Sequence, residues 1–213
     1  MGGSIGGVLK IPVILLNLAY LNLLWVLFSI LGLVFFGFFP ATTSMFAVIR
    51  KWVMGDLEIP IFKTFWSHYK KYFLKSNLLG LVITLVGFFL VFDIRLVQQF
   101  HSGHMLFFYY FLLMIALILG LTVLYVLPVF VHFELSIYKI IKTSFSFMIV
   151  SPLSTIMMFA GGIIIFFILK SLPGLVFIIG GSLTSLLIMW SSYHAFSRLN
   201  QKNISERNFQ SPY

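Results

Sequence analysis

Residues able to perform acid–base chemistry are few and scattered in this chain. The five acidic residues are Asp56, Glu58, Asp93, Glu134 and Glu206. No pair of them lies inside the predicted spans, so the sequence offers no pair of carboxylates at membrane depth. No glycine-rich phosphate loop and no nucleophile elbow appears in the sequence. We therefore expect a protein that is not an enzyme and that uses no cofactor.

Metal ligands are also sparse. His101 and His104 have a spacing that can bind a metal ion, but no third ligand is evident, and a surface loop is the better interpretation. His132, Glu134 and His194 fall near the ends of predicted membrane spans and could meet there. Span ends carry such polar residues routinely, so we predict no metal site.

Polar groups inside the apolar segments offer one alternative function. Asn17 and Asn22 lie in the first segment, and Asp93 lies at the end of the second. The asparagines suit hydrogen bonds between helices, and Asp93 suits an anchor at the membrane interface. Together they could instead line a path for a small solute, which would make the protein a transporter or a channel subunit.

A basic, aromatic stretch over residues 37–75 is the most distinctive part of the chain. It carries six of the fourteen basic residues, which are Arg50, Lys51, Lys63, Lys70, Lys71 and Lys75. Each cation costs about 3 kcal/mol at the centre of a membrane helix. We therefore predict that the stretch lies outside the hydrocarbon of the membrane.

The second half of this stretch has the period of an amphipathic helix. At 100° per residue, its aromatic and apolar side chains fall within an arc of about 140°; they are Ile61, Phe62, Phe65, Trp66, Tyr69, Tyr72 and Phe73. Lysines and small polar residues fill most of the other side, and Pro60 is placed to start the helix. This composition is typical of a helix lying at a membrane surface, although packing against neighbouring protein is the alternative.

Five apolar segments are long enough to cross a bilayer, which requires about 20 residues. They cover residues 11–39, 76–92, 104–131, 151–169 and 172–196. Amphipathic interfacial segments follow the first and third spans, at about 41–75 and 134–148. The predicted fold is an all-α bundle of five transmembrane helices that forms one membrane domain over residues 1–213.

The overall composition supports this assignment. Hydrophobic residues make up 61% of the chain and charged residues 9%, and the mean hydropathy is +1.08. The net charge of +9 lies beside apolar segments, where it orients the spans and meets anionic lipid, so we expect no nucleic-acid partner. There is no cysteine, which excludes disulfides. The run after Lys10 is too long for a cleaved targeting signal.

The distribution of positive charge predicts the orientation. If the segments alternate across the membrane, eleven of the fourteen Lys and Arg residues lie on the side that holds the long first loop. Positive charge marks the cytoplasmic side. We therefore expect a cell-membrane protein whose N-terminus is outside and whose C-terminus is in the cytoplasm.

Several short motifs within the basic stretch resemble the YesL-like family of multi-pass bacterial membrane proteins. The motifs are Pro40-Ala41, Arg50-Lys51-Trp52, Gly55-Asp56, Pro60-x-Phe62, Phe65-Trp66, and Lys70-Lys71 with Phe73. The resemblance is specific over about the first 80 residues. It implies a domain of unknown function with a link to carbohydrate uptake, and it supplies no catalytic or binding residues.

These observations lead to one expected function, with the transporter kept as the alternative. We expect an accessory or scaffold protein of the membrane that docks lipid headgroups or a partner, such as a sugar permease, on its basic aromatic face. The candidate residues on that face are Arg50, Lys51, Trp52, Trp66, Lys70 and Lys71.

Overall fold

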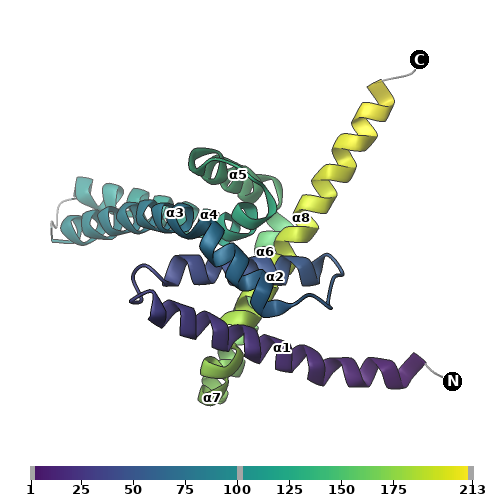
Figure 1. Cartoon of the computed structure of the whole chain (residues 1–213). Helices are drawn as coiled ribbons and strands as arrows, with labels where there is room; N and C mark the ends of the chain where they lie inside the picture. The colour runs from purple at the N-terminus through teal and green to yellow at the C-terminus, as the bar shows by residue number, and fades with distance from the viewer. Residues whose placement is uncertain (1–2, 100–102, 211–213) are drawn as a thin grey trace.

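The computed structural model describes the backbone of residues 3–99 and 103–210, and the side chains of residues 12–99 and 104–198. Every regular element in these ranges is helical, which confirms the predicted all-α fold. The elements in chain order are α1 (Gly3–Leu31), α2 (Phe38–Val53), α3 (Ile61–Val97), α4 (Gly103–His132), α5 (Ile137–Val150), α6 (Pro152–Ser171), α7 (Pro173–Leu175), the π-helical segment η1 (Val176–Gly180) and α8 (Gly181–Gln210) (Figure 1).

Five of these helices are long and apolar enough to cross a membrane, as predicted. The qualifying segments are Pro12–Leu31, Ile61–Val97, His104–His132, Pro152–Ser171 and Pro173–Arg198. Their exposed surfaces are rich in large apolar side chains. Such surfaces match the hydrocarbon of a bilayer, so the chain has the character of a multi-pass membrane protein.

The first predicted span is wrong at its C-terminal end. Residues 11–39 do not form one helix, because α1 ends at Leu31 and the chain turns back through residues 32–37. Two glycines permit the turn: a Cβ atom on Gly32 would collide with the backbone of Gly37. Helix α2 then runs back along α1 (Figure 1), and the indole Nε1 of Trp25 donates a hydrogen bond to the Thr42 hydroxyl at 2.9 Å.

Helix α2 lies in the core of the molecule. Ten of its sixteen residues are buried, on more than one side of the helix, and it contacts α1, α3, α4 and α8. The sequence assigned residues 41–53 to an interfacial segment. Instead, the helix is enclosed by its neighbours: the buried hydroxyls of Thr43 and Ser44 are bonded to the Pro40 carbonyl, and the basic pair Arg50 and Lys51 lies in its last turn.

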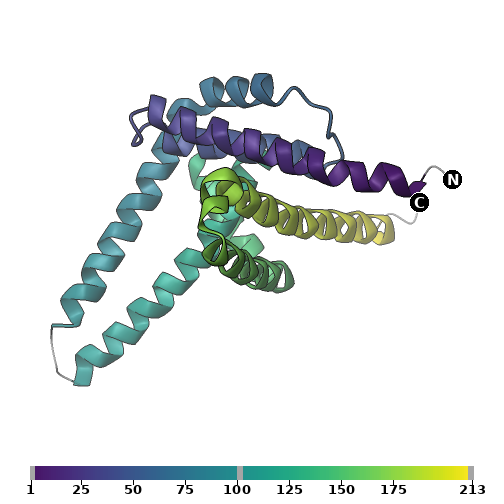
Figure 2. The ribbon, with the colours of Figure 1, turned by 90° about the horizontal axis from the view of Figure 1, so that it is seen from below.

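Helix α3 joins two predicted elements into one. The amphipathic helix expected at residues 61–75 and the span expected at 76–92 form a single helix of 37 residues, preceded by Pro60. Its first part lies beside α1 and α2, and it then continues past the turn between them to lie beside α4 (Figures 1 and 2). Where α3 passes this turn, the Asn77 side chain donates a hydrogen bond to the Phe36 carbonyl at 3.0 Å.

The segment between α6 and α8 contains a break that α1 stabilises. Helix α6 ends at Ser171, and the chain passes through α7 and η1 before α8 begins at Gly181. The side chain of Asn22, which is 1% exposed, contacts both sides of this break. It donates to the Phe177 carbonyl at 2.6 Å and accepts a hydrogen bond from the Ser182 amide at 3.1 Å.

Candidate functional site

A cluster of aromatic rings holds the first part of α3 against α1. The ring of Phe28 on α1 lies 5.2–6.4 Å, between centroids, from the rings of Phe62, Phe65, Trp66 and Tyr69. The Tyr69 hydroxyl also donates a hydrogen bond to the Phe28 carbonyl at 3.3 Å. The aromatic side of the amphipathic helix therefore packs largely on protein, as the alternative interpretation of its period allowed.

The rest of this part of α3 presents an exposed stripe, which we call the outer stripe. Its members are Phe62, Lys63, Trp66, Ser67, Lys70 and Leu74. The ammonium group of Lys70 lies 5.0 Å from the centre of the Trp66 ring, close enough for a cation–π interaction. Trp66 is 37% exposed, so it both packs on Phe28 and faces outward. An aromatic ring beside a lysine is the pairing found where a helix meets the membrane surface.

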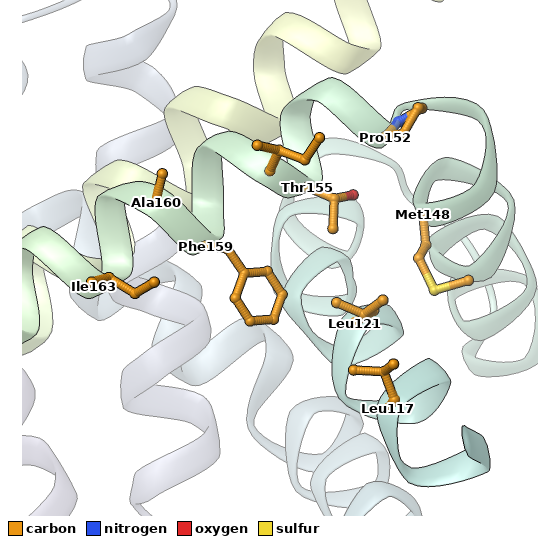
Figure 3. Close-up of a pocket in the computed structure, with 9 residues that line it drawn as sticks. Leu117, Leu121, Met148, Pro152, Thr155, Phe159, Ala160 and Ile163 are labelled. Carbon is orange, nitrogen blue, oxygen red and sulfur yellow. The ribbon is translucent and has the colours of Figure 1, made fainter. Parts of the chain in front are cut away.

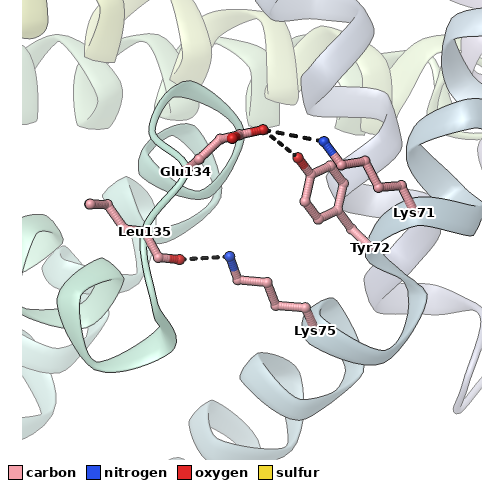
Figure 4. A network of polar contacts seen from close by, with 5 residues as sticks. All are labelled: Lys71, Tyr72, Lys75, Glu134 and Leu135. Carbon is pink, nitrogen blue, oxygen red and sulfur yellow. Dashed lines mark hydrogen bonds and ion pairs between the residues drawn. The ribbon is translucent and has the colours of Figure 1, made fainter.

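The opposite side of α3 binds the loop between α4 and α5 (Figure 4). The Lys71 ammonium lies 3.2 Å from the Glu134 carboxylate, and the Tyr72 hydroxyl donates to the same oxygen at 3.1 Å. One turn further along, Lys75 donates to the Leu135 carbonyl at 2.6 Å. These groups line an open cavity of about 320 Å³. The hydrogen bond from Lys71, together with that from Tyr72, holds the pKa of Glu134 below its ordinary value.

More positive charge lies near Lys71, at the end of α2. Arg50, in the last turn of α2, donates through Nε to Nδ1 of His132 at 3.3 Å. This geometry assigns the ring proton of a neutral His132 to Nε2. His68 lies within Coulombic range of Arg50, Lys51 and Lys71. We call the basic group made of Arg50, Lys51, His68, Lys71 and Lys75 the cationic junction.

The structure separates the six residues predicted to form one docking face. Trp66 and Lys70 lie on the outer stripe, whereas Arg50, Lys51 and Lys71 lie in the cationic junction. Trp52 is 9% exposed, and its indole nitrogen makes no hydrogen bond with any described residue. The six residues predicted to share one docking face therefore lie on two separate surfaces, apart from Trp52, which is in the core.

Residues of the alternative solute path are not brought together. Asn22 is buried against the break before α8, and Asn17 lies on α1 and is partly exposed. Asp93 is exposed near the end of α3, in the half that lies beside α4 (Figure 2). Each of these side chains has a different environment.

The side chains considered for metal binding also have separate surroundings. No group of three metal-ligating side chains occurs among the described residues. His101 lies outside the described residues, and His104 is exposed. His132 contacts Arg50, Glu134 contacts Lys71, and the ring of His194 lies 4.4 Å from that of Trp190.

An apolar groove lies between α4, α5 and α6 (Figure 3). Its volume is about 520 Å³, and its walls are almost entirely hydrocarbon. The groove is lined by Leu117, Leu121, Met148, Pro152, Thr155, Ile156, Phe159, Ala160 and Ile163. Thr155 is the one lining side chain with a hydroxyl, and it is bonded to the Tyr125 hydroxyl at 2.8 Å. The groove therefore offers shape and apolar contact rather than polar chemistry.

Sequence reasoning missed the partners that complete the cationic junction. Tyr72 and Lys75 belong to the amphipathic helix, but their contacts lie about 60 residues away, on the loop after α4. One usable signal was the spacing of Lys71 and Lys75, which places both ammonium groups on one helix face. A second was Glu134, which directly follows the third span and has no acidic neighbour in sequence.

Comparison with known proteins places the chain among proteins without an assigned activity. Residues 18–94 match the family described as "Protein of unknown function, DUF624". No solved structure matches the chain.

Three similar proteins come from Bacillus subtilis (strain 168), and each is described as uncharacterized. YesL is 37% identical over 193 residues, which is 90% of both chains. YteU is 38% identical over 200 residues, covering 93% of this chain and 89% of its own. YesV is 35% identical over 186 residues, covering 85% and 88%. Similarity at this level over nearly the whole length shows that the chain belongs to the YesL-like, DUF624 family.

Proposed function

We propose that this protein is a non-enzymatic scaffold of the bacterial cell membrane, which presents the outer stripe of α3 at the cytoplasmic surface. The observation that carries the proposal is the continuity of α3. A helix of 37 residues is about 55 Å long, whereas the hydrocarbon of a bilayer is about 30 Å thick. Roughly 17 residues of α3 therefore extend beyond the hydrocarbon.

The composition of α3 favours its N-terminal end as the extending part. Four of its five lysine and arginine residues lie between Ile61 and Lys75, and the following residues are apolar as far as Asp93, apart from small polar side chains. The outer stripe changes in the same way, from Lys63 and Lys70 to Leu74. A helix that leaves the bilayer with this order of side chains places the lysines among the headgroups.

Helix α5 supplies a second surface of the same kind. Ile140 and Ser144 face the protein and are buried, whereas Tyr138, Lys139 and Lys142 are exposed. Both surfaces follow a predicted outside-to-inside span, so both lie on the cytoplasmic side in the orientation that the charge bias favours. The partner class suggested by the family resemblance is a membrane permease for sugars.

The location of the outer stripe can be tested by cysteine labelling, because the chain contains no cysteine. Ser67→Cys and Leu85→Cys are both at exposed positions of α3, one in each half. We expect a membrane-impermeant maleimide to label Ser67→Cys in inverted vesicles and not in intact cells. Leu85→Cys should react in neither. Labelling of Ser67→Cys in intact cells would overturn the orientation, and no labelling on either side would place the stripe within lipid or protein.

The scaffold role requires a second experiment. The double variant Trp66→Ala/Lys70→Gln removes the cation–π pair of the outer stripe. Phe92→Ala/Arg95→Gln removes an aromatic and a basic residue from the exposed far end of the same helix and serves as the matched control. We expect the first variant, and not the second, to lose a co-purifying permease in mild detergent. An unchanged set of partners in both variants would overturn the scaffold role.

A second candidate function is a transporter or channel subunit for small solutes. The break before α8 favours it, because π-helical segments and interrupted helices recur at functional sites of membrane proteins. Uptake of a labelled solute into proteoliposomes, abolished by Asn22→Ala or Asp93→Asn, would support this function over the scaffold. Proteoliposomes that take up no solute would argue against it.

A further inference from the structure

The cationic junction collects basic groups from two helices at one place. Arg50 and Lys51 come from the last turn of α2, whereas His68, Lys71 and Lys75 come from α3. His68 is within Coulombic range of three of the others, and Glu134 is within range of both Lys71 and Lys75. The junction is therefore one electrostatic unit although its members are up to 25 positions apart in sequence.

Negative charge at the junction does not balance this positive charge. The single ion pair among the described side chains joins Lys71 to Glu134, whose side chain is 82% exposed. The Coulombic partners of Glu134 are Lys71 and Lys75, and Arg50 and Lys51 form no ion pair with any described side chain. Like charges repel one another in a setting that water only partly screens. The arrangement is thus suited to an anion that enters the open cavity beside Lys71 and Lys75.

The surface next to the junction indicates what kind of anion fits. Lys71, Lys75 and Leu78 lie on one face of α3, because residues three, four and seven positions apart share a helix face. Leu78 is 52% exposed, and further exposed apolar residues, including Leu85, follow it along the same side. Along this face of α3, basic side chains are therefore followed by exposed apolar side chains. A molecule with an anionic head and apolar chains matches this order, whereas a soluble anion would use only its first part.

We propose that the cationic junction binds the phosphate group of an anionic phospholipid, whose acyl chains lie along Leu78 and the apolar residues beyond it. The proposal rests on the proposed function, because it requires α3 to pass from the headgroup region into the hydrocarbon. It adds a defined ligand at residues other than those of the outer stripe. Basic pockets of this kind between membrane helices are known places for phospholipid headgroups.

The test uses the purified full-length protein in mild detergent, with bound lipid counted by native mass spectrometry. The probes are phosphatidylglycerol, phosphatidylcholine of matched chain length, and inorganic phosphate as competitor. Hydrogen bonds to charged groups contribute about 1.5–3 kcal/mol, so we expect phosphatidylglycerol to be retained at least about tenfold better than phosphatidylcholine. Equal retention of the two lipids would overturn the proposal.

Three variants make the test specific to the junction. Lys51→Gln/Lys71→Gln should lower the affinity for phosphatidylglycerol by about tenfold or more. Glu134→Gln should raise it, because it removes the carboxylate that competes for Lys71. Lys139→Gln/Lys142→Gln removes the same charge from the exposed side of α5 and should leave the affinity unchanged. An equal loss in the α5 variant would show a general charge effect and overturn the site.

Two further measurements keep each outcome decisive. Lys51→Gln by itself breaks none of the hydrogen bonds described above, so it serves if the double variant fails to fold. If inorganic phosphate displaces the lipid at a concentration equal to that of the lipid, the ligand is a soluble phosphate and the lipid assignment is overturned. If Ser67→Cys is labelled in inverted vesicles only, as expected, but the protein shows no preference for phosphatidylglycerol, the lipid site is rejected. The scaffold proposal is then unaffected.

Discussion

Asn22 on α1 accepts a hydrogen bond from the backbone amide of Ser182, 160 residues away, at the first turn of α8. The same side chain donates to the Phe177 carbonyl in η1 at 2.6 Å. One side-chain amide therefore bonds a backbone acceptor in η1 and a backbone donor in α8. The first helix of the chain is in this way bound to the beginning of the last.

The first prediction concerns this pair of bonds. Asn22→Ala removes both of these hydrogen bonds at a position that is 1% exposed. We expect a loss of about 1–3 kcal/mol in unfolding free energy, measured by thermal or denaturant unfolding in detergent. Asn17→Ala, at a partly exposed site on the same helix, is the control and should change stability by less than about 0.5 kcal/mol. Equal effects from the two variants would contradict the role of Asn22.

The second prediction concerns close helix contact at Gly80. A Cβ atom there would overlap the ring of Phe39, whereas a Cβ atom on Gly87 would meet no atom within 4 Å. We expect Gly80→Val to lower the unfolding free energy by about 1–3 kcal/mol, since the ring has to move. Gly87→Val, two turns further along α3, provides the matched comparison. A destabilisation of similar size in both variants would mean that helix propensity, rather than packing on Phe39, is responsible.

The third prediction concerns the aromatic cluster around Phe28. Phe28→Ala removes the ring that contacts Phe62, Phe65, Trp66 and Tyr69. We expect a loss of about 3–5 kcal/mol, together with a shift of tryptophan emission as Trp66 loses its neighbour. Phe36→Ala removes a ring that is 61% exposed and should have a much smaller effect. An unchanged emission spectrum in Phe28→Ala would contradict the packing of Trp66.

The fourth prediction concerns pH. The pKa of Glu134 is lowered in the folded protein by its bonds with Lys71 and Tyr72, so the carboxylate contributes stability above its ordinary pKa of about 4.5. That contribution is lost as pH falls through the lower, folded-state value. We expect the difference in melting temperature between the wild type and Glu134→Gln to be constant from pH 7 to pH 5. It should shrink below pH 4.5 and be smaller in high salt, because the pair is exposed. A difference that persists at pH 2 would contradict the role of the charge.

The sequence predicted the elements that depend on local pattern. Five apolar runs gave five helices of spanning length, because hydropathy and length decide this property without reference to tertiary contacts. The amphipathic period after Pro60 also appeared as a helix with its aromatic side packed and its lysines mostly outward. Each of these features is encoded within a window of about 20 residues.

The features that were missed depend on contacts between distant segments. The run from residue 11 to residue 39 reads as continuous, and only the close approach of Gly32 to Gly37 shows that the chain turns back there. The burial of α2 follows from four neighbouring helices, which no local period encodes. The same holds for Arg50, whose partner His132 lies 82 residues away.

The unbroken backbone of α3 has a mechanical consequence. A rod about 55 Å long that pivots near one end moves its other end by about 10 Å for each 10° of tilt. The turns that carry Lys63 and Trp66 lie at one end of this rod, and Asp93 and Arg95 lie near its other end. A tilt of α3 about its Lys63 end would therefore appear as a displacement beside Asp93 and Arg95.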